Sequence, residues 1–514
     1  MSGRWFPKTT HSSESSASKP GSLKGIRGSK SLAYEEPQQD SILAAELVGD
    51  ALAALSRKRR RPTGYLIAKR ARSSCQHLRT QAGFGDQAMT ISVAEMRRTP
   101  EGYFTVRWGQ PEYTDWIDES MSWKESCYIG DWSFLWERRF RGPDVLKLFS
   151  DVSVNSFAKF ALGQSKHVIH CNDAGKIIHE GILSRLGEDE FMLFGRGGFW
   201  VDYKLRHGSY KAVSEPDDWF NFQVSGPNAV HVVEKAAGKS VRDIAFMHSG
   251  KIHIAGHETL ALRQGMAGEL GYELQGPTAN AREVYEAVLE AGREFGIRRL
   301  GGRAAFINHL EACFPTIVTD YLPAIFDEEM AEYLAEFTTA MPGYATTFNI
   351  AGSFEADDVS AWYRSPVELG WKNRIKFDHD FIGRQALEEE VAHPRRVIRT
   401  LVWNANDVVE VYASLFGQGK PYHYMEIPRD QRGFMYADRV TRNGKTVGIA
   451  TSRGYSYYFR QMLSLCVIDV ECSEPGTPVT VVWGEPDEPQ KEIRAQVAPA
   501  PYKKDNRRID VRSL

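Results

Sequence analysis

The stretch Gly265-Met266-Ala267-Gly268-Glu269-Leu270-Gly271-Tyr272-Glu273-Leu274 joins a glycine-rich turn to a segment in which polar and apolar residues alternate. Successive side chains of a strand point to opposite faces, so the alternation can direct the Glu273 carboxylate inward, into a cavity. A carboxylate buried in this way needs hydrogen-bond donors. The alternative is a glutamate exposed on a strand, which this stretch alone favours because glutamate is seldom buried.

The segments on either side predict a mixed α+β protein. From about residue 90 to 505 the apolar residues switch repeatedly between the period of a strand and that of a helix. The apolar residues of 284–289 recur at helical spacing and predict an amphipathic helix. Asn443-Gly444 lies between two strand-like segments and predicts a type I′ hairpin, and residues 479–483 predict a further strand.

Composition limits the class of protein. The chain has 514 residues, of which 42% are hydrophobic and 25% charged, as in a globular protein with a sizeable core. Its net charge of -2 provides no overall field that would attract nucleic acid or an anionic membrane. No stretch is long and apolar enough for a membrane-spanning helix. We therefore expect neither nucleic acid nor membrane as a partner.

Cysteine usage predicts reduced thiols in a cytoplasmic protein. The six cysteines have neither the density of a disulfide scaffold nor the CxxC spacing of a structural zinc site; they are residues 75, 127, 171, 313, 466 and 472. His248, His253 and His257 lie in a strand-like run that would scatter them over both faces. We therefore expect no metal site.

The first 88 residues differ from the rest of the chain. They are rich in serine and glycine and include a basic run from Arg57 to Arg61, which we interpret as a solvated tail. We expect this segment to be disordered, or to be an extension annotated in error if Met89 is the true start.

Several separated segments together resemble the glycine cleavage T-protein (aminomethyltransferase) superfamily, and in particular its tetrahydrofolate-dependent aromatic O-demethylases. The matching segments are residues 140–148, 222–227, 265–274, 376–384 and 454–457. The resemblance implies an α+β fold with two lobes over 89–394, a C-terminal β-barrel lobe over 395–505 and a tail over 506–514. It also implies a small aromatic acid as substrate, such as one derived from lignin.

The same resemblance assigns candidate binding residues. In the superfamily, the glutamate that matches Glu273 binds the pterin ring of tetrahydrofolate. The arginine that matches Arg196 holds the substrate carboxylate, and the glycines beside it let a ligand approach. Phe194 belongs to the same segment, and Phe314 lies where the demethylases have a tryptophan near the cofactor. Glu180 matches an acidic position near the reacting carbon.

Four positions depart from the demethylases. Where those enzymes contact substrate through two tyrosines, a glutamine and a histidine, this chain has Val106, Asp131, Phe134 and Ala305. Breaking a phenol ether requires a proton for the leaving oxygen, and Val, Phe and Ala cannot donate one. Asp131 or another residue, such as His309, would then have to supply it.

These departures leave alternatives open. The first hypothesis is an O-demethylating methyltransferase that uses tetrahydrofolate. The second is a decarboxylase or other lyase that acts on a lignin-derived aromatic acid and has kept the fold but no longer uses folate. Decarboxylation is helped when the substrate carboxylate lies in an apolar pocket that disfavours its charge. A third is a folate-binding protein without activity. The absence of a nucleophile elbow, P-loop or dinucleotide fingerprint opposes a serine hydrolase, an NTPase or a nicotinamide enzyme.

Overall fold

The computed structural model describes residues 92–98, 109–341, 348–431 and 435–514. All of these residues belong to one unit, residues 62–514. The predictions for residues 1–88, for Met89 as the start and for Val106 lie outside the described residues.

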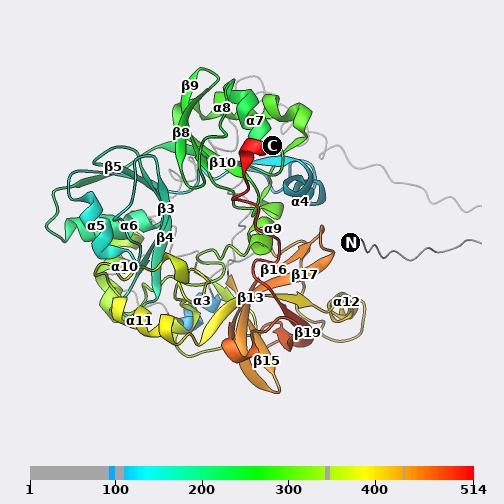
Figure 1. Cartoon of the computed structure of the whole chain (residues 1–514). Helices are drawn as coiled ribbons and strands as arrows, with labels where there is room; N and C mark the ends of the chain where they lie inside the picture. Colours follow the sequence, from blue (N-terminus) through cyan, green and yellow to red (C-terminus); the bar gives the residue numbers. More distant parts are fainter. Residues whose placement is uncertain (1–91, 99–108, 342–347, 432–434) are drawn as a thin grey trace, which may run out of the picture. The chain divides into compact units, whose positions relative to one another are not determined.

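A six-stranded sheet contains the segment that carries Glu273. Its strand order is β11-β1-β7-β10-β9-β8, with β1 parallel to β11 and all other neighbours antiparallel. Figure 1 labels β8, β9 and β10 of this sheet. The strands are β1 (Cys127–Asp131), β7 (Trp219–Ser225), β8 (Ser249–Ile254), β9 (His257–Arg263), β10 (Gly271–Pro277) and β11 (Ile297–Arg299).

Two helices, α7 (Ala229–Ala237) and α8 (Ala281–Gly292), pack on this sheet through a shared apolar cluster. Helix α8 confirms the helix predicted from residues 284–289, because Val284 and Val288 are fully buried. A 3₁₀ turn extends it to Gly296, whose φ of 72° is the left-handed conformation typical of a helix end.

A five-stranded antiparallel sheet, β3-β4-β5-β2-β6, forms the second lobe. Its strands are β2 (Glu137–Arg141), β3 (Ser165–Cys171), β4 (Ile177–Arg185), β5 (Glu190–Phe194) and β6 (Val213–Pro216). Helices α5 (Val145–Val152) and α6 (Gly197–Arg206) pack on it (Figure 1). Its core continues into α10 (Ala331–Ala340) and α11 (Arg384–Ala392).

The C-terminal part is a closed barrel with the order β13-β17-β16-β15-β18-β19. Its strands are β13 (Arg396–Trp403), β15 (Asp438–Arg442), β16 (Lys445–Ser456), β17 (Gln461–Asp469), β18 (Pro478–Trp483) and β19 (Lys491–Ala498). Helix α12 (Ala405–Ser414) lies beside β19 (Figure 1), and the short strands β12 (Ile350–Ala351) and β14 (Met435–Tyr436) pair in parallel. The predicted α+β fold with a C-terminal β-barrel is confirmed.

Helix α9 (Gly302–Ala312) is buried on almost all sides. It packs against α4 (Trp116–Glu125) and against barrel strand β16. The remaining described α-helix, α3 (Val93–Arg98), contacts β12. Because α9 has hardly any solvent-facing surface, polar residues such as Asn308 and His309 must find their partners inside the protein.

The last residues pack onto the protein rather than projecting from it. Lys503 Nζ donates to the Gly268 carbonyl at 2.9 Å and pairs with Glu269, and Asn506 donates to the same carboxylate at 3.0 Å. Val511 is fully buried in the cluster under the first sheet. The predicted tail, 506–514, therefore fixes the loop that follows β9.

The Asn443-Gly444 hairpin forms as predicted between β15 and β16, with Arg442 opposite Lys445. We expect Gly444→Ala to lower the free energy of unfolding by about 1 kcal/mol, because an alanine at positive φ is strained. Gly444 has φ 74° and nothing within 4 Å of an added Cβ, so the effect is conformational. Urea denaturation measures it, with exposed Gly417→Ala as control; equal stability of the two variants would contradict the prediction.

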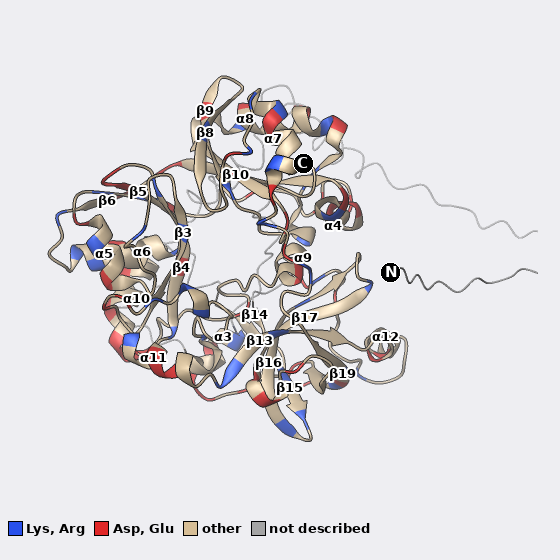
Figure 2. Ribbon diagram, viewed as in Figure 1, with Lys and Arg blue, Asp and Glu red and all other residues tan. Residues whose placement is uncertain are grey.

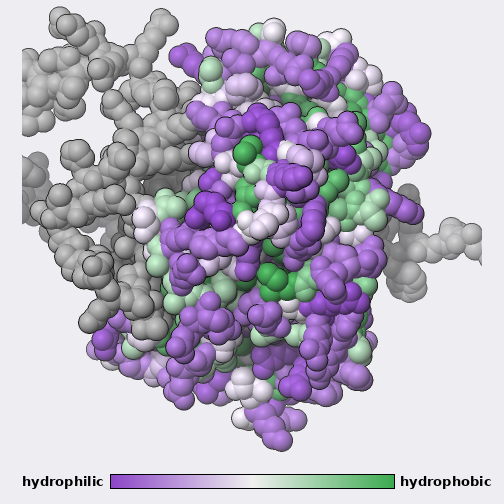
Figure 3. All heavy atoms as spheres, turned by 90° about the vertical axis from the view of Figure 1, so that its left-hand side faces the viewer, coloured by the Kyte–Doolittle hydropathy of each residue, from purple (hydrophilic) through white to green (hydrophobic). Residues whose placement is uncertain are grey.

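The charged residues of outer helices α8 and α11 are mainly acidic, with one arginine near the start of each, Arg282 and Arg384 (Figure 2). Hydrophilic residues dominate the face shown in Figure 3, where apolar residues form small separate groups. No helix within the described part of the chain is long and apolar enough to span a membrane. The five cysteines in that part are free thiols.

Candidate active site

A cavity lies where the first sheet, the second sheet and α9 meet, and most of the predicted site residues line it. Its wall comes from the turn between β1 and β2, the middle of β4, the end of β5, the polar face of β7 and β10, and the end of α9. The lining residues are Trp132, Phe134, Leu135, Trp136, Glu180, Gly181, Ile182, Phe194, Gly195, Arg196, Asn221, Gln264, Met266, Glu273, Phe306, His309, Phe314, Thr316, Ile317 and Val318.

Glu273 points inward from β10 and is 5% exposed, as the strand alternation allows. Side-chain amides of four residues donate to its carboxylate: Asn221 at 3.4 Å, Gln223 at 3.5 Å, Gln264 at 3.1 Å and Gln275 at 3.2 Å. Burial raises the pKa of Glu273 to about 7, and the donors oppose this shift. The site therefore holds a carboxyl group that is poised to exchange its proton near neutral pH.

The amide oxygens around Glu273 are buried acceptors. Asn221 Oδ1, Gln264 Oε1 and Gln275 Oε1 have no hydrogen-bond partner among the described residues. Buried acceptors without partners are uncommon in folded proteins. Asn221 and Gln264 line the cavity with Glu273, so their oxygens and the carboxylate form a set that a flat ligand rich in N–H groups could satisfy, and the pterin ring of tetrahydrofolate is such a ligand.

Arg196 lies at the other side of the cavity, directly before α6. Its guanidinium stacks over the Trp136 ring at 5.4 Å. The flanking glycines are required, because a Cβ on Gly195 would lie 3.0 Å from the Glu180 carbonyl and one on Gly197 would lie 2.9 Å from His170 Nε2. The backbone thus places a planar cation at the cavity wall, where it can bind a carboxylate through two hydrogen bonds.

Glu180 also lines the cavity, and its Oε2 lies 3.0 Å from His167 Nε2. The next residue back, His179, points to the opposite face of β4 and is fully buried against Tyr333 and Phe337. Burial lowers the pKa of His179 well below its usual range, so this imidazole is neutral. The partner of Glu180 is therefore His167, not the neighbouring residue in sequence.

His309 reaches the cavity from α9. Its Nδ1 lies 3.0 Å from the Ala305 carbonyl, which can only accept, so Nδ1 carries the proton. Burial lowers the pKa of His309 to about 4, and the hydrogen bond to Ala305 opposes this shift. At neutral pH, Nε2 is thus the lone-pair nitrogen. In this tautomer Nε2 can accept a hydrogen bond and has no proton to donate.

Aromatic side chains form the remaining wall. Phe314 lies between two histidine rings. Its ring centroid is 5.6 Å from that of His309 and 6.2 Å from that of His167. Phe134 and Phe194 line the cavity as well. A planar ligand could stack against these rings.

Two predicted residues do not reach the cavity lining. Ala305 is fully buried in a cluster with Trp123 and Tyr128, and its carbonyl accepts from His309 Nδ1. Asp131 ends β1, where its carboxylate accepts from the Ser133 amide at 2.9 Å. Burial raises the pKa of Asp131, but the side chain is directed to its own turn.

The residues that the sequence interpretation missed are mainly the amides around Glu273. Asn221 and Gln223 on β7, and Gln275 on β10, alternate with apolar residues just as Glu273 does. Polar residues at every second position of two buried strands indicate a polar face turned to a ligand. That signal was present, whereas nothing in the sequence pairs His167 with Glu180.

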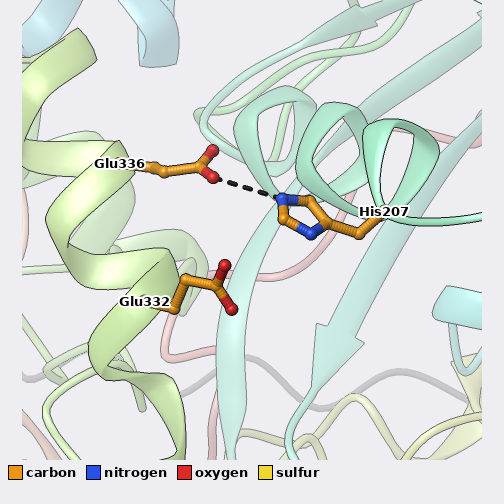
Figure 4. A group of neighbouring side chains, drawn as sticks. All are labelled: His207, Glu332 and Glu336. Carbon is orange, nitrogen blue, oxygen red and sulfur yellow. Dashed lines mark hydrogen bonds and ion pairs between the residues drawn. The ribbon is translucent and has the colours of Figure 1, made fainter.

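One group of three potential metal ligands occurs in the described ranges, away from this cavity. His207 follows α6 and faces Glu336 of α10, with Glu332 one turn away (Figure 4). Glu336 already pairs with Arg206 at 2.6 Å, and Glu332 accepts from the Tyr203 hydroxyl at 3.1 Å. Because both carboxylates have partners, we assign no metal to this surface group, and the absence of a metal site stays a prediction.

Comparison with known proteins finds relatives over most of the chain. Residues 76–330 match the GCVT N-terminal domain family. Sesamin methylene transferase from Sinomonas sp. (strain No.22) is 35% identical over 428 residues, which cover 78% of this chain and 92% of the relative. Syringate O-demethylase from Sphingobium sp. (strain NBRC 103272 / SYK-6) is 33% identical over 416 residues, which cover 76% of this chain and 89% of the relative.

The fold has a counterpart among solved structures. The glycine cleavage system aminomethyltransferase T from Bartonella henselae superposes with a TM-score of 0.58 at 18% identity, covering 79% of this chain and 95% of that one. At this identity the likeness concerns the fold alone.

Proposed function

The chain belongs to the glycine cleavage T-protein superfamily, and we propose that it is a tetrahydrofolate-dependent one-carbon transferase that O-demethylates a methoxylated aromatic acid, one of the lignin-derived class. The aminomethyltransferases among its relatives support enzymatic activity of this family. We further expect it to act in the cytoplasm on a free small-molecule acid.

The observation that carries the proposal is the amide-lined carboxylate. Glu273 fits the N–H groups of a pterin ring, together with the oxygens of Asn221 and Gln264 that have no partner within the described ranges. A buried carboxylate with a raised pKa, whose hydrogen-bond partners in the described part of the chain are neutral amides, would be costly if it had no ligand to bind. When bound, tetrahydrofolate supplies the nitrogen that accepts the one-carbon unit.

The other cavity residues would orient the substrate and handle its proton. Arg196 would hold the carboxylate, and the aromatic wall would place the ring so that the methyl group faces the cofactor. As the bond from the methyl carbon to the phenolic oxygen breaks, that oxygen takes up a proton. We assign this proton to the His167–Glu180 pair, because Asp131 is outside the cavity lining and His309 presents an acceptor.

A lyase that does not use folate is the second candidate. It is favoured by the apolar aromatic wall and by a relative named trimethylamine-oxide aldolase from Ruegeria pomeroyi (strain ATCC 700808 / DSM 15171 / DSS-3), 26% identical over 74% of this chain. This chain covers only 42% of that relative, so the comparison does not transfer its activity. Under this reading Glu273 would have no cofactor to bind.

The deciding experiment incubates the purified full chain with a panel of aromatic acids, with and without tetrahydrofolate, and follows products by mass. The panel contains methoxylated and methylenedioxy-substituted acids. Only when tetrahydrofolate is present, we expect a methoxylated acid to give a product lighter by CH₂, and a methylenedioxy-substituted acid to give a product lighter by one carbon. Loss of carbon dioxide or formaldehyde without folate would instead establish the lyase, and folate binding without turnover of any acid would indicate a non-catalytic binding protein.

A further inference from the structure

Behind the cavity wall, a chain of buried hydrogen bonds joins the Glu273 side to His309. It runs from Gln223 on β7 through Tyr128 on β1 to Asn308 on α9. None of these three side chains lines the cavity, and each is at most 1% exposed. Buried polar side chains of this kind are retained where they fix the orientation of other groups.

A backbone amide at the Gln223 end fixes which groups donate and which accept along this series of hydrogen bonds. Met266 N–H can only donate, and it reaches Gln223 Oε1 at 3.2 Å. Gln223 must therefore turn its NH₂ group toward Glu273, at 3.5 Å. Since Oε1 can only accept, the Tyr128 hydroxyl, which also contacts it, has to donate.

The remaining links follow from this direction. Because the Tyr128 hydroxyl gives its proton to Gln223, it accepts from Asn308 Nδ2 at 3.4 Å. Asn308 then presents Oδ1 to His309 Nδ1, which lies 2.5 Å away. Burial together with the charge of Glu273 raises the pKa of Tyr128, so its proton is retained at physiological pH.

The second end leads independently to the same assignment. The Ala305 carbonyl also requires a proton on His309 Nδ1. Two fixed backbone groups, one on the loop after β9 and one on α9, therefore agree on the orientation of every side chain between them. A chain with mixed directions would leave at least one buried group without a partner.

We propose that Tyr128 and Asn308 are positioning residues that hold His309 with Nε2 as a hydrogen-bond acceptor for an O–H or N–H group of the bound ligand. The use of that acceptor in catalysis rests on the proposed function, whereas the orientation of the ring does not. The chain also links the orientation of the amide beside Glu273 to that of His309, so both sides of the cavity are set together.

The orientation can be measured by NMR of the full chain labelled with ¹⁵N-histidine. The His309 signals are identified by subtracting the spectrum of His309→Gln. In the wild type we expect a neutral ring with the proton on Nδ1 throughout pH 6–8. A proton on Nε2, or a charged ring at pH 7, would overturn the proposal without any assay of activity.

Tyr128→Phe tests whether the hydrogen bonds from Gln223 through Tyr128 and Asn308 orient His309. It removes one hydroxyl and frees the Asn308 amide to turn its NH₂ group toward His309, so the Nδ1–H to Nε2–H ratio should fall about fivefold, the value of one typical hydrogen bond. Tyr272→Phe is the matched control, because the Tyr272 hydroxyl is buried on the same sheet without a partner among the described residues. Equal spectra for both variants would exclude a positioning role for Tyr128.

Asn308→Asp provides an opposite test. A carboxylate beside Nδ1–H stabilises the charged imidazole, so the pKa of His309 should rise by about one unit or more. An unchanged titration in the folded variant would contradict the contact. If the variant does not fold, Tyr128→Phe still decides the proposal. Failure of demethylation with the expected spectra would count against the proposed function alone.

Discussion

Replacing Glu273 by glutamine should weaken tetrahydrofolate binding by about a hundredfold, because it removes the charge that two ligand N–H groups would share. The substituted amide has one acceptor oxygen, and its NH₂ group would face the donors of Asn221, Gln223, Gln264 and Gln275. Calorimetric titration with 5-formyltetrahydrofolate, a stable analogue, measures the affinity. Thermal unfolding of the unliganded variant checks that the fold is retained.

The pH dependence of this affinity has a defined sign. The pKa of Glu273 is raised to about 7, so the carboxyl group is increasingly protonated as the pH falls below that value. Protonation removes the acceptor charge, and the wild-type affinity should fall by up to about tenfold per pH unit below 7. The Glu273→Gln variant should show no such slope. Glu258→Gln, an exposed change on neighbouring strand β9, is the control and should keep the wild-type profile.

An affinity that does not change in Glu273→Gln would remove this residue from the cofactor site. It would also remove the observation on which the transferase proposal depends. Loss of affinity without the pH slope would instead show that binding uses the site but does not require the ionised carboxylate.

Replacing Arg196 by methionine should lower kcat/KM for an aromatic acid by about a hundredfold, since a bidentate arginine–carboxylate contact contributes on the order of 3 kcal/mol. Methionine keeps an unbranched apolar side chain that can still cover the Trp136 ring. We expect most of the effect in KM, because the carboxylate is bound in the ground state as well as in the transition state. Steady-state kinetics of the full chain with tetrahydrofolate present measures it.

The control for the Arg196→Met experiment is a second substrate, an ester without the carboxylate, and not a second variant. The methyl ester of the same acid lacks the charge, so wild type and Arg196→Met should convert it with similar kcat/KM. An equal loss for acid and ester would mean that Arg196 supports the structure of the cavity and does not recognise the carboxylate. Arg196→Lys should recover only part of the activity, because an ammonium group cannot bind a carboxylate in the same fork geometry.

Local patterns were sufficient for several elements. Apolar spacing in residues 284–289 predicted α8, and Asn443-Gly444 predicted the β15–β16 turn. Each depends on interactions within a few residues, namely one helix face and two residues at positive φ. The alternation around Glu273 also predicted an inward carboxylate on a strand, as the structure has it.

Long-range packing decided which candidate residues meet at the cavity. Glu180 lies within β4 and Arg196 follows β5, whereas His309 comes from a helix more than a hundred residues further along the chain. Asp131 and Ala305 match positions that contact substrate in the demethylases. The turn after β1 and the burial of α9 nevertheless direct their side chains away from the cavity lining. A comparison of positions does not specify such directions, because they depend on the rotation of a whole element.

The sequence by itself determined the mixed α+β class and the alternation that buries Glu273, because these follow from periodicity, and it indicated the family through the resemblance of several separated segments. Only the tertiary structure decided that amides from two neighbouring strands and from the loop after β9 surround this carboxylate. It also decided that His309 carries its proton on Nδ1. A pKa and a tautomer depend on which groups lie within hydrogen-bond distance, and here those groups come from segments far apart in the chain.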